Sequence, residues 1–346
     1  MKVGICFGGY CPLHRGHLEV IMKAKKENDK CLIVVCGYEG EPRAEALGIT
    51  LDEKEIIIKE IFRKDDHVEV IKISDTDLGL DQSMSMGNWK IWTDEVMKSV
   101  GKNDEPRFYV SEPFYEECLG KLGYSVVKME RVLGLSGTAI RENPIKFWPY
   151  INDEFKPLLA KRILVTGTAS EGKSTLCRDI STYFNLPLIE EMGRNIMEFE
   201  GKTDIDLGYV DFSRFLYVQH YEIESSLGPV VISDTDNLVT LMYAEVYKDD
   251  PDIPKFNEDD YRRLVAVYSE LERIEWDKIY LLPPKNNFVD DGTRYMKQST
   301  MEERKKNYDI LVKLLKSNGY WDKVEILDGN YYENFCKVKE YINGII

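Results

Sequence analysis

A glycine-rich segment in the second half of the chain ends in a lysine and a serine. The sequence GTASEGKS, residues 167–174, matches GxxxxGK[ST], follows the apolar run RILVT and opens the amphipathic stretch KSTLCRDISTYF. Gly167 and Gly172 allow backbone N–H groups to turn toward a phosphate. Lys173 then reaches the β- and γ-phosphate oxygens, and Ser174, followed by Thr175, supplies hydroxyls for Mg²⁺ and the nucleotide. This segment predicts a site for a nucleoside triphosphate.

Acidic side chains end two more predicted strands of this half. VVISDTD places Asp234 and Asp236 after a buried run, and LPLIEEMGR places Glu190, Glu191 and Arg194 after another. A carboxylate in such a place can hold Mg²⁺, or take the proton of a substrate hydroxyl that attacks the γ-phosphate. We expect Asp234 at the metal, Arg194 and Asp236 at the acceptor substrate, and either Glu191 or Asp234 as the base. The choice between these two acids stays open.

The polar segment PPKNNFVDDGTRYMKQ has the composition of a lid over such a site. Its Arg294 is a candidate to bind the nucleotide and to stabilise charge on the transferring phosphoryl group. A motor or switch ATPase is the competing interpretation of the glycine-rich segment. This half of the chain offers no obvious relay element, which favours a small-molecule kinase.

A second group of residues suited to phosphate chemistry lies near the start of the chain. GGYCPLHRGHLEVIMKA, residues 8–24, holds two of the four histidines, His14 and His17, on a turn before a predicted helix. Imidazole N–H groups at a helix N-terminus can donate to triphosphate oxygens, and Gly8 and Gly16 permit close approach of the backbone to a ligand. The alternative is a surface turn that carries two histidines by chance.

A later segment of the same half supports the first interpretation. GLSGTAIRENP predicts a helix N-terminus with Ser136 as N-cap, where Ser136, Thr138 and Arg141 would form a second anion site. Gly137, between the two hydroxyl residues, is expected to add flexibility there. Two such elements in one domain suggest that a triphosphate is held between them. Since no nucleophilic side chain is evident, we expect a substrate phosphate to attack the α-phosphorus directly and pyrophosphate to leave.

These residues must be positioned by alternating strands and helices. Strand-like runs such as VGICFGG, CLIVVCG and HVEVIKI alternate with helical patterns such as LDEKEIIIKEIFRK, and the alternation restarts at KRILVTG after the proline-containing connector NPIKFWPYINDEFKPLLAK. This order predicts an α/β protein of two three-layer domains with parallel sheets, over residues 1–150 and 151–346. In such sheets ligands bind at the carboxyl ends of the strands, where both phosphate segments fall.

Composition narrows the class of protein further. The chain has 61 acidic and 46 basic residues and a net charge of −15, which argues against general affinity for nucleic acid. No apolar run is long enough to cross a membrane, and the first residues predict a strand rather than a targeting segment. The seven cysteines include no CxxC pair. We therefore expect a cytoplasmic protein with reduced thiols and no membrane partner, and a homo-oligomer is left open.

GGYCPLHRGH together with LSGTAIR resembles the HxGH and ISxTxxR signatures of the nucleotidylyltransferase superfamily. SMGNWKIW resembles the Asn-Trp segment of nicotinamide mononucleotide (NMN) adenylyltransferases, and the resemblance implies that Asn88, Trp89 and Trp92 bind the nicotinamide ring. An aromatic face suits a flat cationic ring. The alternative is that the two tryptophans belong to the core. The segment EGEPRAEALGITLDEK matches no pattern of these enzymes, and its basic residues receive no role.

Followed by a P-loop kinase, this arrangement resembles the NadR family of bifunctional NMN adenylyltransferases and ribosylnicotinamide kinases. The resemblance extends over nearly the whole chain and includes EEMGR, ISDTD and NNFVDDGTR. It implies a Rossmann-like nucleotidylyltransferase fold, then a P-loop kinase fold. The helix-turn-helix domain of some members is absent from this sequence, so DNA binding is not expected.

The activity implied is phosphorylation of ribosylnicotinamide to NMN with MgATP, followed by transfer of AMP from a second ATP to give NAD and pyrophosphate. The expected partners are small molecules, namely ATP, NMN, ribosylnicotinamide and NAD, with Mg²⁺ as the metal. Two alternatives remain: the same folds acting on another nucleoside and phosphate monoester, or a non-catalytic regulator that senses NAD and ATP.

Overall fold

The polypeptide divides into two units, Met1–Leu159 and Ala160–Ile346. The structure is a computed structural model that describes residues 1–346 except 82, 84, 131–133 and 290–295. The division falls later than residue 150 because the connector packs on the first unit. Asn152 N donates to Leu13 O at 3.0 Å, His14 pairs with Ile151 in an antiparallel bridge, and Trp148 and Phe155 are buried.

The first unit is built on a parallel sheet with the order β3-β2-β1-β4-β5. Its strands are β1 (Lys2–Gly8), β2 (Lys30–Gly37), β3 (Val68–Ser74), β4 (Glu105–Val110) and β5 (Ser125–Lys128). The centre of β2 is buried on both faces, as the continuous apolar run CLIVV requires of a strand covered by helices on both sides.

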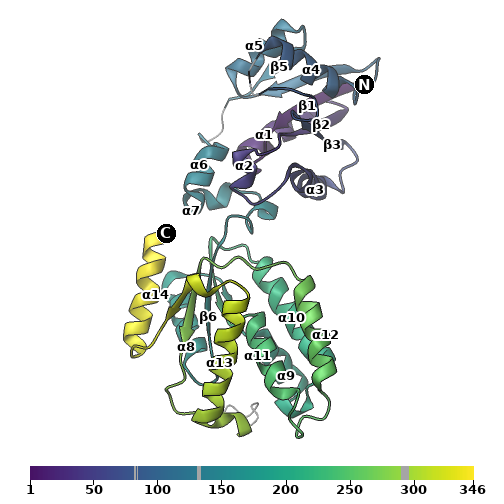
Figure 1. Ribbon diagram of the computed structural model, residues 1–346. Coiled ribbons are helices and arrows are strands. Elements are labelled where there is room, and N and C mark those ends of the chain that lie inside the picture. Colours follow the sequence, from purple (N-terminus) through teal and green to yellow (C-terminus); the bar gives the residue numbers. More distant parts are fainter. Residues whose placement is uncertain (82, 84, 131–133, 290–295) are drawn as a thin grey trace. The chain divides into compact units, whose positions relative to one another are not determined.

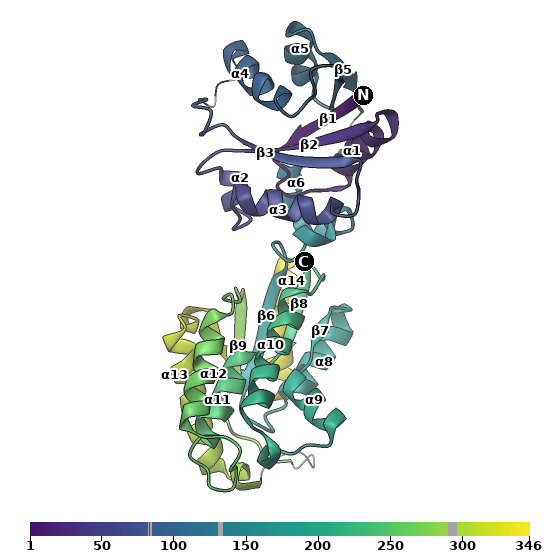
Figure 2. The same cartoon turned by 90° about the vertical axis from the view of Figure 1, so that its right-hand side faces the viewer.

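Helices cover both faces of this sheet (Figures 1 and 2). On one face, α4 and α5 pack over an apolar cluster that includes Ile5, Trp92 and Phe108. In chain order, the helices of this unit are α1 (Arg15–Glu27), α2 (Pro42–Glu45), α3 (Leu51–Phe62), α4 (Met86–Met97), α5 (Pro113–Lys121), α6 (Gly137–Glu142) and α7 (Pro144–Phe147), with 3-10 turns η1 (Trp148–Tyr150) and η2 (Asp153–Phe155). The sequence patterns predicted neither α2 nor the short helical turns of the connector, α7, η1 and η2.

The second unit has its own parallel sheet, with the order β10-β9-β6-β8-β7. The strands are β6 (Lys161–Gly167), β7 (Leu188–Ile189), β8 (Val230–Asp234), β9 (Lys278–Leu282) and β10 (Val324–Ile326). The helices are α8 (Lys173–Phe184), α9 (Met192–Glu200), α10 (Tyr209–Glu224), α11 (Asn237–Tyr247), α12 (Glu258–Glu270), α13 (Met301–Ser317) and α14 (Tyr331–Ile345), with turns η3 (Asp204–Asp206), η4 (Met296–Ser299) and η5 (Trp321–Lys323). In Figures 1 and 2, α8 and α14 cover one face, and α10, α11 and α13 lie on the other.

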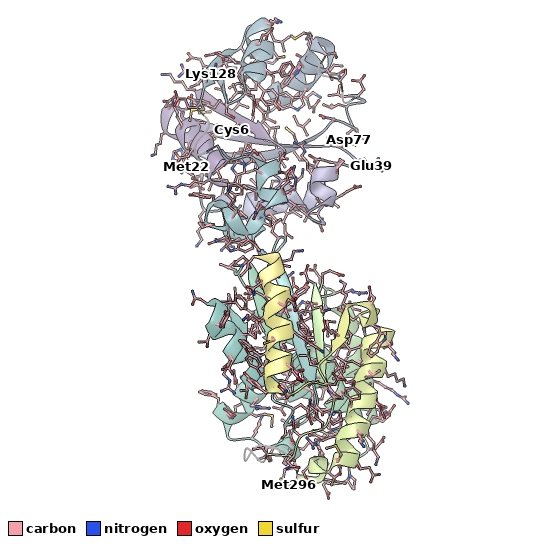
Figure 3. The ribbon with its side chains drawn as sticks, turned by 90° about the vertical axis from the view of Figure 1, so that its left-hand side faces the viewer. Cys6, Met22, Glu39, Asp77, Lys128 and Met296 are labelled. Carbon is pink, nitrogen blue, oxygen red and sulfur yellow. The ribbon has the colours of Figure 1, made fainter. Side chains whose placement is uncertain are left out.

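The predicted fold class is confirmed: each unit is a three-layer α/β structure with an all-parallel sheet. Side chains fill the interior of each unit, and Cys6, labelled in Figure 3, lies inside the first. All seven cysteines are free thiols. Within the part of the chain that is described, no helix is long and apolar enough to span a membrane.

Candidate functional sites

The histidine segment of the first unit joins the central strand β1 to helix α1. The strand order places β2 and β4 on either side of β1. Successive strands are therefore added first on one side of β1 and then on the other, and open α/β sheets form a crevice for ligands at such a point. His14 is the N-cap residue of α1, and its carbonyl accepts from His17 N at 2.9 Å and Leu18 N at 3.1 Å. The loop is therefore fixed by the first turn of the helix.

The rings of His14 and His17 stack, with centroids 3.7 Å apart and an interplanar angle of 24°. Both ring nitrogens of His14 and Nδ1 of His17 are buried and have no hydrogen-bond partner among the described residues. Burial lowers the pKa of His14 to about 4, and burial together with the charge of His14 lowers the pKa of His17 well below its usual range. Both rings are neutral at pH 7, and each retains one N–H donor for a ligand.

The segment around Ser136 packs against this loop. Ser136 is the N-cap of α6, as predicted, and its Oγ accepts from Ala139 N at 3.1 Å. Arg141 donates through Nη1 to the carbonyl of Cys11 and through Nη2 to Thr138 Oγ1 at 3.3 Å. The structure thus brings the HRGH and LSGTAIR motifs together in one site.

Gly137 has a role different from the flexibility that we expected. A Cβ at this position would lie 2.9 Å from the carbonyl oxygen of Cys11 and 3.1 Å from Nη1 of Arg141. Real Cβ atoms do not approach main-chain oxygens this closely. Glycine is required here because it lets the start of α6 touch the histidine loop.

Two adjoining cavities open beside these motifs. One, of about 220 Å³, is lined by Gly8, His17 and Arg43 among others, and we call it the histidine cavity. The other, of about 180 Å³, is lined by Asn88, Trp89 and Trp92 with Gly8 and Arg43, and we call it the tryptophan cavity. Gly8 and Arg43 line both, so the two cavities share a wall.

The tryptophans serve the core and the cavity together. Trp89 and Trp92 pack 5.6 Å apart, and Trp92 lies 5.0 Å from Phe7. Asn88 at the start of α4 donates through Nδ2 to Asp81 Oδ1 at 2.6 Å. The two interpretations of this segment are therefore compatible, because the rings that close the apolar core also form a wall of the cavity.

Sequence reasoning missed Arg43, which lies in the segment that matched no known pattern. A Cβ at Gly9 would lie 3.2 Å from the Arg43 guanidinium, so this group rests on the backbone after β1. Burial lowers the pKa of Arg141, and the charge of Arg43 contributes in the same direction, so the two cations are close. The signal for Arg43 in the sequence was only a basic residue between two strands.

In the second unit, the glycine-rich segment joins β6 to α8. Gly172 is the N-cap of α8 with φ of 83°, and Lys173 follows as the first helical residue. At Gly167, φ is 143° and a Cβ would lie 2.5 Å from Leu282 O, which no side chain tolerates. Lys173 is buried, and its Nζ donates to Thr168 O at 2.8 Å. Its ammonium is therefore held over the loop, as a triphosphate site needs. Thr175, the other predicted hydroxyl residue after Ser174, is exposed.

Asp234 ends β8 and interacts with Lys173 and Ser174 of the loop. Burial raises the pKa of its carboxyl, the charge of Lys173 opposes this, and a hydrogen bond with Ser174 opposes it further. Its buried Oδ1 has no hydrogen-bond partner among the described residues. A carboxylate oxygen left unsatisfied beside a serine hydroxyl fits a metal ligand pair. No group of three or more His, Cys, Asp or Glu side chains suited to a metal is found in the described part of the chain.

A cavity of about 80 Å³ lies beside these residues and is the candidate acceptor site. It is lined by Glu191, Arg194, Asp204, Thr235 and several aromatic rings, namely Phe212, Phe215, Tyr243 and Tyr247. Glu191 and Arg194 form an ion pair of 2.8 Å. Acids for hydroxyl groups and rings for a flat base line one pocket. The sequence predicted Glu191, the N-cap of α9, but not Asp204, which lies in η3, or the rings, which come from α10 and α11.

One predicted residue, Asp236, does not join this cluster. Asp236 caps α11 through Leu238 N at 3.2 Å, and burial raises the pKa of its carboxyl to about 7. It lines a separate cavity with His220 and Tyr320 instead of the acceptor cavity. Arg294 lies outside the described residues.

A buried ion pair holds the glycine-rich segment from behind. Glu171 lies within the loop, and its Oε1 accepts a hydrogen bond from Nη1 of Arg304 at 2.8 Å. Both side chains are almost fully buried. Arg304 also donates to Ala169 O at 3.2 Å, while the other oxygen of Glu171 accepts from Lys285 N and from both nitrogens of Asn286. The variable positions of the phosphate loop thus connect it to α13 and to the chain after β9.

Comparisons with known proteins agree with this arrangement. A family model described as an AAA domain matches residues 162–333. The trifunctional NAD biosynthesis/regulator proteins NadR of Salmonella typhimurium and Escherichia coli are each 25% identical to this chain, over 100% and 99% of its length and 83% of theirs. A crystal structure of a NadR protein in complex with NR has 29% identity, a TM-score of 0.80 and coverage of 98% of this chain and 96% of its own. Another, in complex with NAD and AMP-PNP, has 28% identity, a TM-score of 0.78 and coverage of 99% and 96%. Over nearly its whole length, and so over both units, this chain is a relative of the NadR proteins.

Proposed function

We propose that the second unit is a ribosylnicotinamide kinase that uses ATP and Mg²⁺. A pocket that includes Thr235, next to Asp234, combines carboxylates with aromatic rings, as a nucleoside with a flat base requires. The similar NadR protein in complex with NR supports the identity of the acceptor.

The positions of Asp234 and Glu191 suggest different roles for these two acids. Ser174 and Asp234 would hold Mg²⁺, which supplies charge neutralisation at the phosphates. Glu191 lines the acceptor cavity and Asp234 does not, so we assign Glu191 as the base that takes the proton of the 5′-hydroxyl. Arg194 pairs with Glu191 at 2.8 Å and orients its carboxylate. Lys173 stabilises charge on the transferred phosphoryl group.

We propose that the first unit transfers AMP from ATP to NMN. The ATP triphosphate would lie between the histidine loop and α6, where His14, His17, Thr138 and Arg141 converge. The nicotinamide ring would enter the tryptophan cavity, and Arg43, on the wall common to both cavities, would bind the phosphate between them.

The chemistry of this site is positioning and charge stabilisation. Oxygen of the NMN phosphate attacks the α-phosphorus, the bond to the β-phosphate oxygen breaks, and pyrophosphate leaves with the electron pair. Neutral imidazole N–H groups that are already buried donate to phosphate oxygens without first losing a hydration shell. No covalent intermediate with the protein is needed.

The observation that carries the proposal is the stacked histidine pair, whose His17 lines a cavity that shares Gly8 and Arg43 with the tryptophan cavity. The experiment is incubation of the chain with MgATP and ribosylnicotinamide, with mass detection of NMN and NAD. Accumulation of NAD from ribosylnicotinamide supports both activities, and NMN alone supports only the kinase. If neither product forms while ATP analogues bind, the chain is a sensor and the proposal is wrong. Cytoplasmic location and lack of nucleic-acid binding stay predictions.

A further inference from the structure

A buried ion pair lies beneath the two cavities of the first unit, in the segment to which the motifs give no role. The side chains of Lys54 and Glu41 are 0% and 1% exposed, and Nζ lies 2.8 Å from Oε2. Lysine and glutamate are almost never fully buried unless paired, and such a pair by itself adds little stability over apolar residues. Its presence next to a ligand cavity suggests a purpose other than stability.

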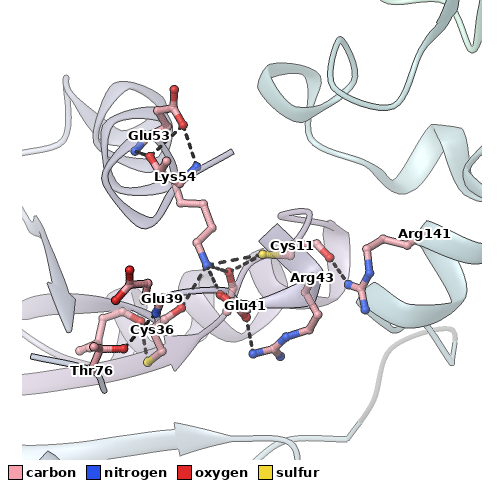
Figure 4. A network of polar contacts seen from close by, with 12 residues as sticks. Cys11, Cys36, Glu39, Glu41, Arg43, Glu53, Lys54, Thr76 and Arg141 are labelled. Carbon is pink, nitrogen blue, oxygen red and sulfur yellow. Dashed lines mark hydrogen bonds and ion pairs between the residues drawn. The ribbon is translucent and has the colours of Figure 1, made fainter. Parts of the chain in front are cut away.

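Lys54 joins two strand ends that border the site. Besides Glu41, its ammonium donates to Gly9 O at 3.1 Å, after β1, and to Cys36 O at 3.2 Å, near the end of β2 (Figure 4). With Cys11 Sγ, four acceptors surround an ammonium that has three N–H groups, so none of its donors is left without an acceptor. Cys11 Sγ lies 3.5 Å from the same nitrogen. Lys54 therefore fixes the backbone after β1 relative to β2 and to Glu41.

Glu41 in turn holds the guanidinium of Arg43, which lines both cavities. Its Oε1 lies 2.5 Å from Nη2 of Arg43, whose side chain is 49% exposed (Figure 4). The contact is an ion pair without the alignment of a hydrogen bond, because Oε1 has no hydrogen-bond donor among the described residues. The guanidinium thus keeps N–H groups for a ligand while the buried carboxylate holds its position over Gly9.

We propose that Glu41 and Lys54 are positioning residues for the mononucleotide substrate. Lys54 orients Glu41, and Glu41 holds the Arg43 guanidinium at the wall shared by the histidine and tryptophan cavities. The three side chains carry one net positive charge, which faces the place where the phosphate monoester must lie between the ring and ATP. The inference rests on the proposed function of the first unit.

The first test is Glu41→Gln, which keeps the size of the side chain and removes its charge. The KM for NMN should rise about tenfold, the equivalent of about 1.4 kcal/mol of binding, because Arg43 is no longer held. The KM for ATP in adenylyl transfer should stay within about twofold, and ribosylnicotinamide phosphorylation in the same chain should not change. Glu45→Gln, an exposed acid on the same short helix α2, is the matched control and should behave as the parent.

A second pair of variants separates positioning from a merely structural role. In an Arg43→Met background, Glu41→Gln should cause no further rise in the KM for NMN, because the residue through which it acts is gone. The double variant Glu41→Gln/Lys54→Met removes both buried charges. Its thermal stability should exceed that of Lys54→Met alone, while its KM for NMN stays raised. If the pair were only structural, the KM would recover together with stability.

Calorimetric binding of NMN without ATP keeps this inference distinct from the proposed function. A parent chain that binds NMN without turnover refutes adenylyl transfer, and the ratio of Kd values between the variants and the parent then tests the positioning. A KM or Kd for Glu41→Gln equal to that of the parent overturns the inference alone. Effects of Glu41→Gln and Arg43→Met that add independently overturn it as well, and a parent that binds no NMN overturns both.

Discussion

Replacing Arg304 by methionine tests how the phosphate-binding loop of the second unit is held. Arg304 is 2% exposed and lies on α13, far in sequence from the loop that it contacts. Methionine retains the volume and apolar contacts of the side chain and removes its three donated hydrogen bonds, to Glu171, Ala169 and Asn286. The carboxylate of Glu171 then loses its countercharge in a buried place.

The structure sets the size of the effect. Removing one partner of a buried ion pair costs about 3–5 kcal/mol. Glu171 still accepts from Lys285 N at 3.1 Å, Asn286 N at 3.2 Å and Asn286 Nδ2 at 3.1 Å, so it is not left bare. We therefore expect the lower end, about 3 kcal/mol. For a unit of this size, a loss of about 3 kcal/mol lowers the Tm by about 6–12 °C.

The assay is calorimetric unfolding of the parent and of Arg304→Met, with hydrogen exchange to assign each transition to its unit. The transition of the second unit should fall, and the KM for ATP in phosphorylation of ribosylnicotinamide should rise, while adenylyl transfer by the first unit stays unchanged. Lys305→Met, the exposed neighbour on α13, is the control. A fall in Tm below about 2 °C would show that the buried pair does not brace the loop.

Three other changes test individual groups. Lys173→Ala should abolish ribosylnicotinamide phosphorylation and leave AMP transfer to NMN within about twofold, because the two phosphate sites lie in different units. His17→Ala should lower adenylyl transfer about 100-fold, as loss of a donor to transition-state charge does, and a rate within about threefold of the parent would mean that the site is misassigned. For His14, the folded pKa of about 4 lies below the usual 6.5, so the unfolded chain binds the proton more tightly. The free energy of unfolding is therefore unaffected by this group above pH 6.5. It falls as the pH drops from 6.5 toward 4, by about 3 kcal/mol in all, because the unfolded chain takes up the proton first. His14→Gln should flatten that part of the decline in urea unfolding between pH 7 and 4, and an unchanged pH profile would contradict the assignment.

Elements whose cause is local could be predicted from the sequence. The run KRILVTG and the stretch KSTLCRDISTYF coincide with β6 and α8, because an apolar strand, a glycine turn and an amphipathic period each act within a few residues. Ser136 was identified as an N-cap for the same reason, since it needs only the N–H of Ala139, three residues on.

Features that depend on distant partners could not be predicted. Lys54 lies in LDEKEIIIKEIF, where a charged residue would normally face solvent, yet it is fully buried because the start of α3 lies against the ends of β1 and β2. Glu171 occupies a position that the phosphate-loop pattern leaves free, and its partner is 133 residues away. Asp236 follows Asp234 by two residues, but its side chain turns to cap α11. Proximity in sequence did not give proximity in the site.

The proposed sites of the two units would bind the same kind of anion in a chain of net charge −15, and they would do so by different physical means. In the first, burial keeps His14 and His17 neutral, so they act as dipolar donors whose desolvation is complete before ATP arrives. In the second, Lys173 is buried near Asp234, whose pKa is raised by burial. The charges of these two side chains would be balanced by phosphate and metal together. An overall acidic field repels ATP from most of the surface, and each site overcomes this only at short range, where a few placed donors exclude water. This locality explains why single buried residues such as Glu41 and Arg304, which touch no phosphate, are expected to control binding through the one cation or loop that each of them holds.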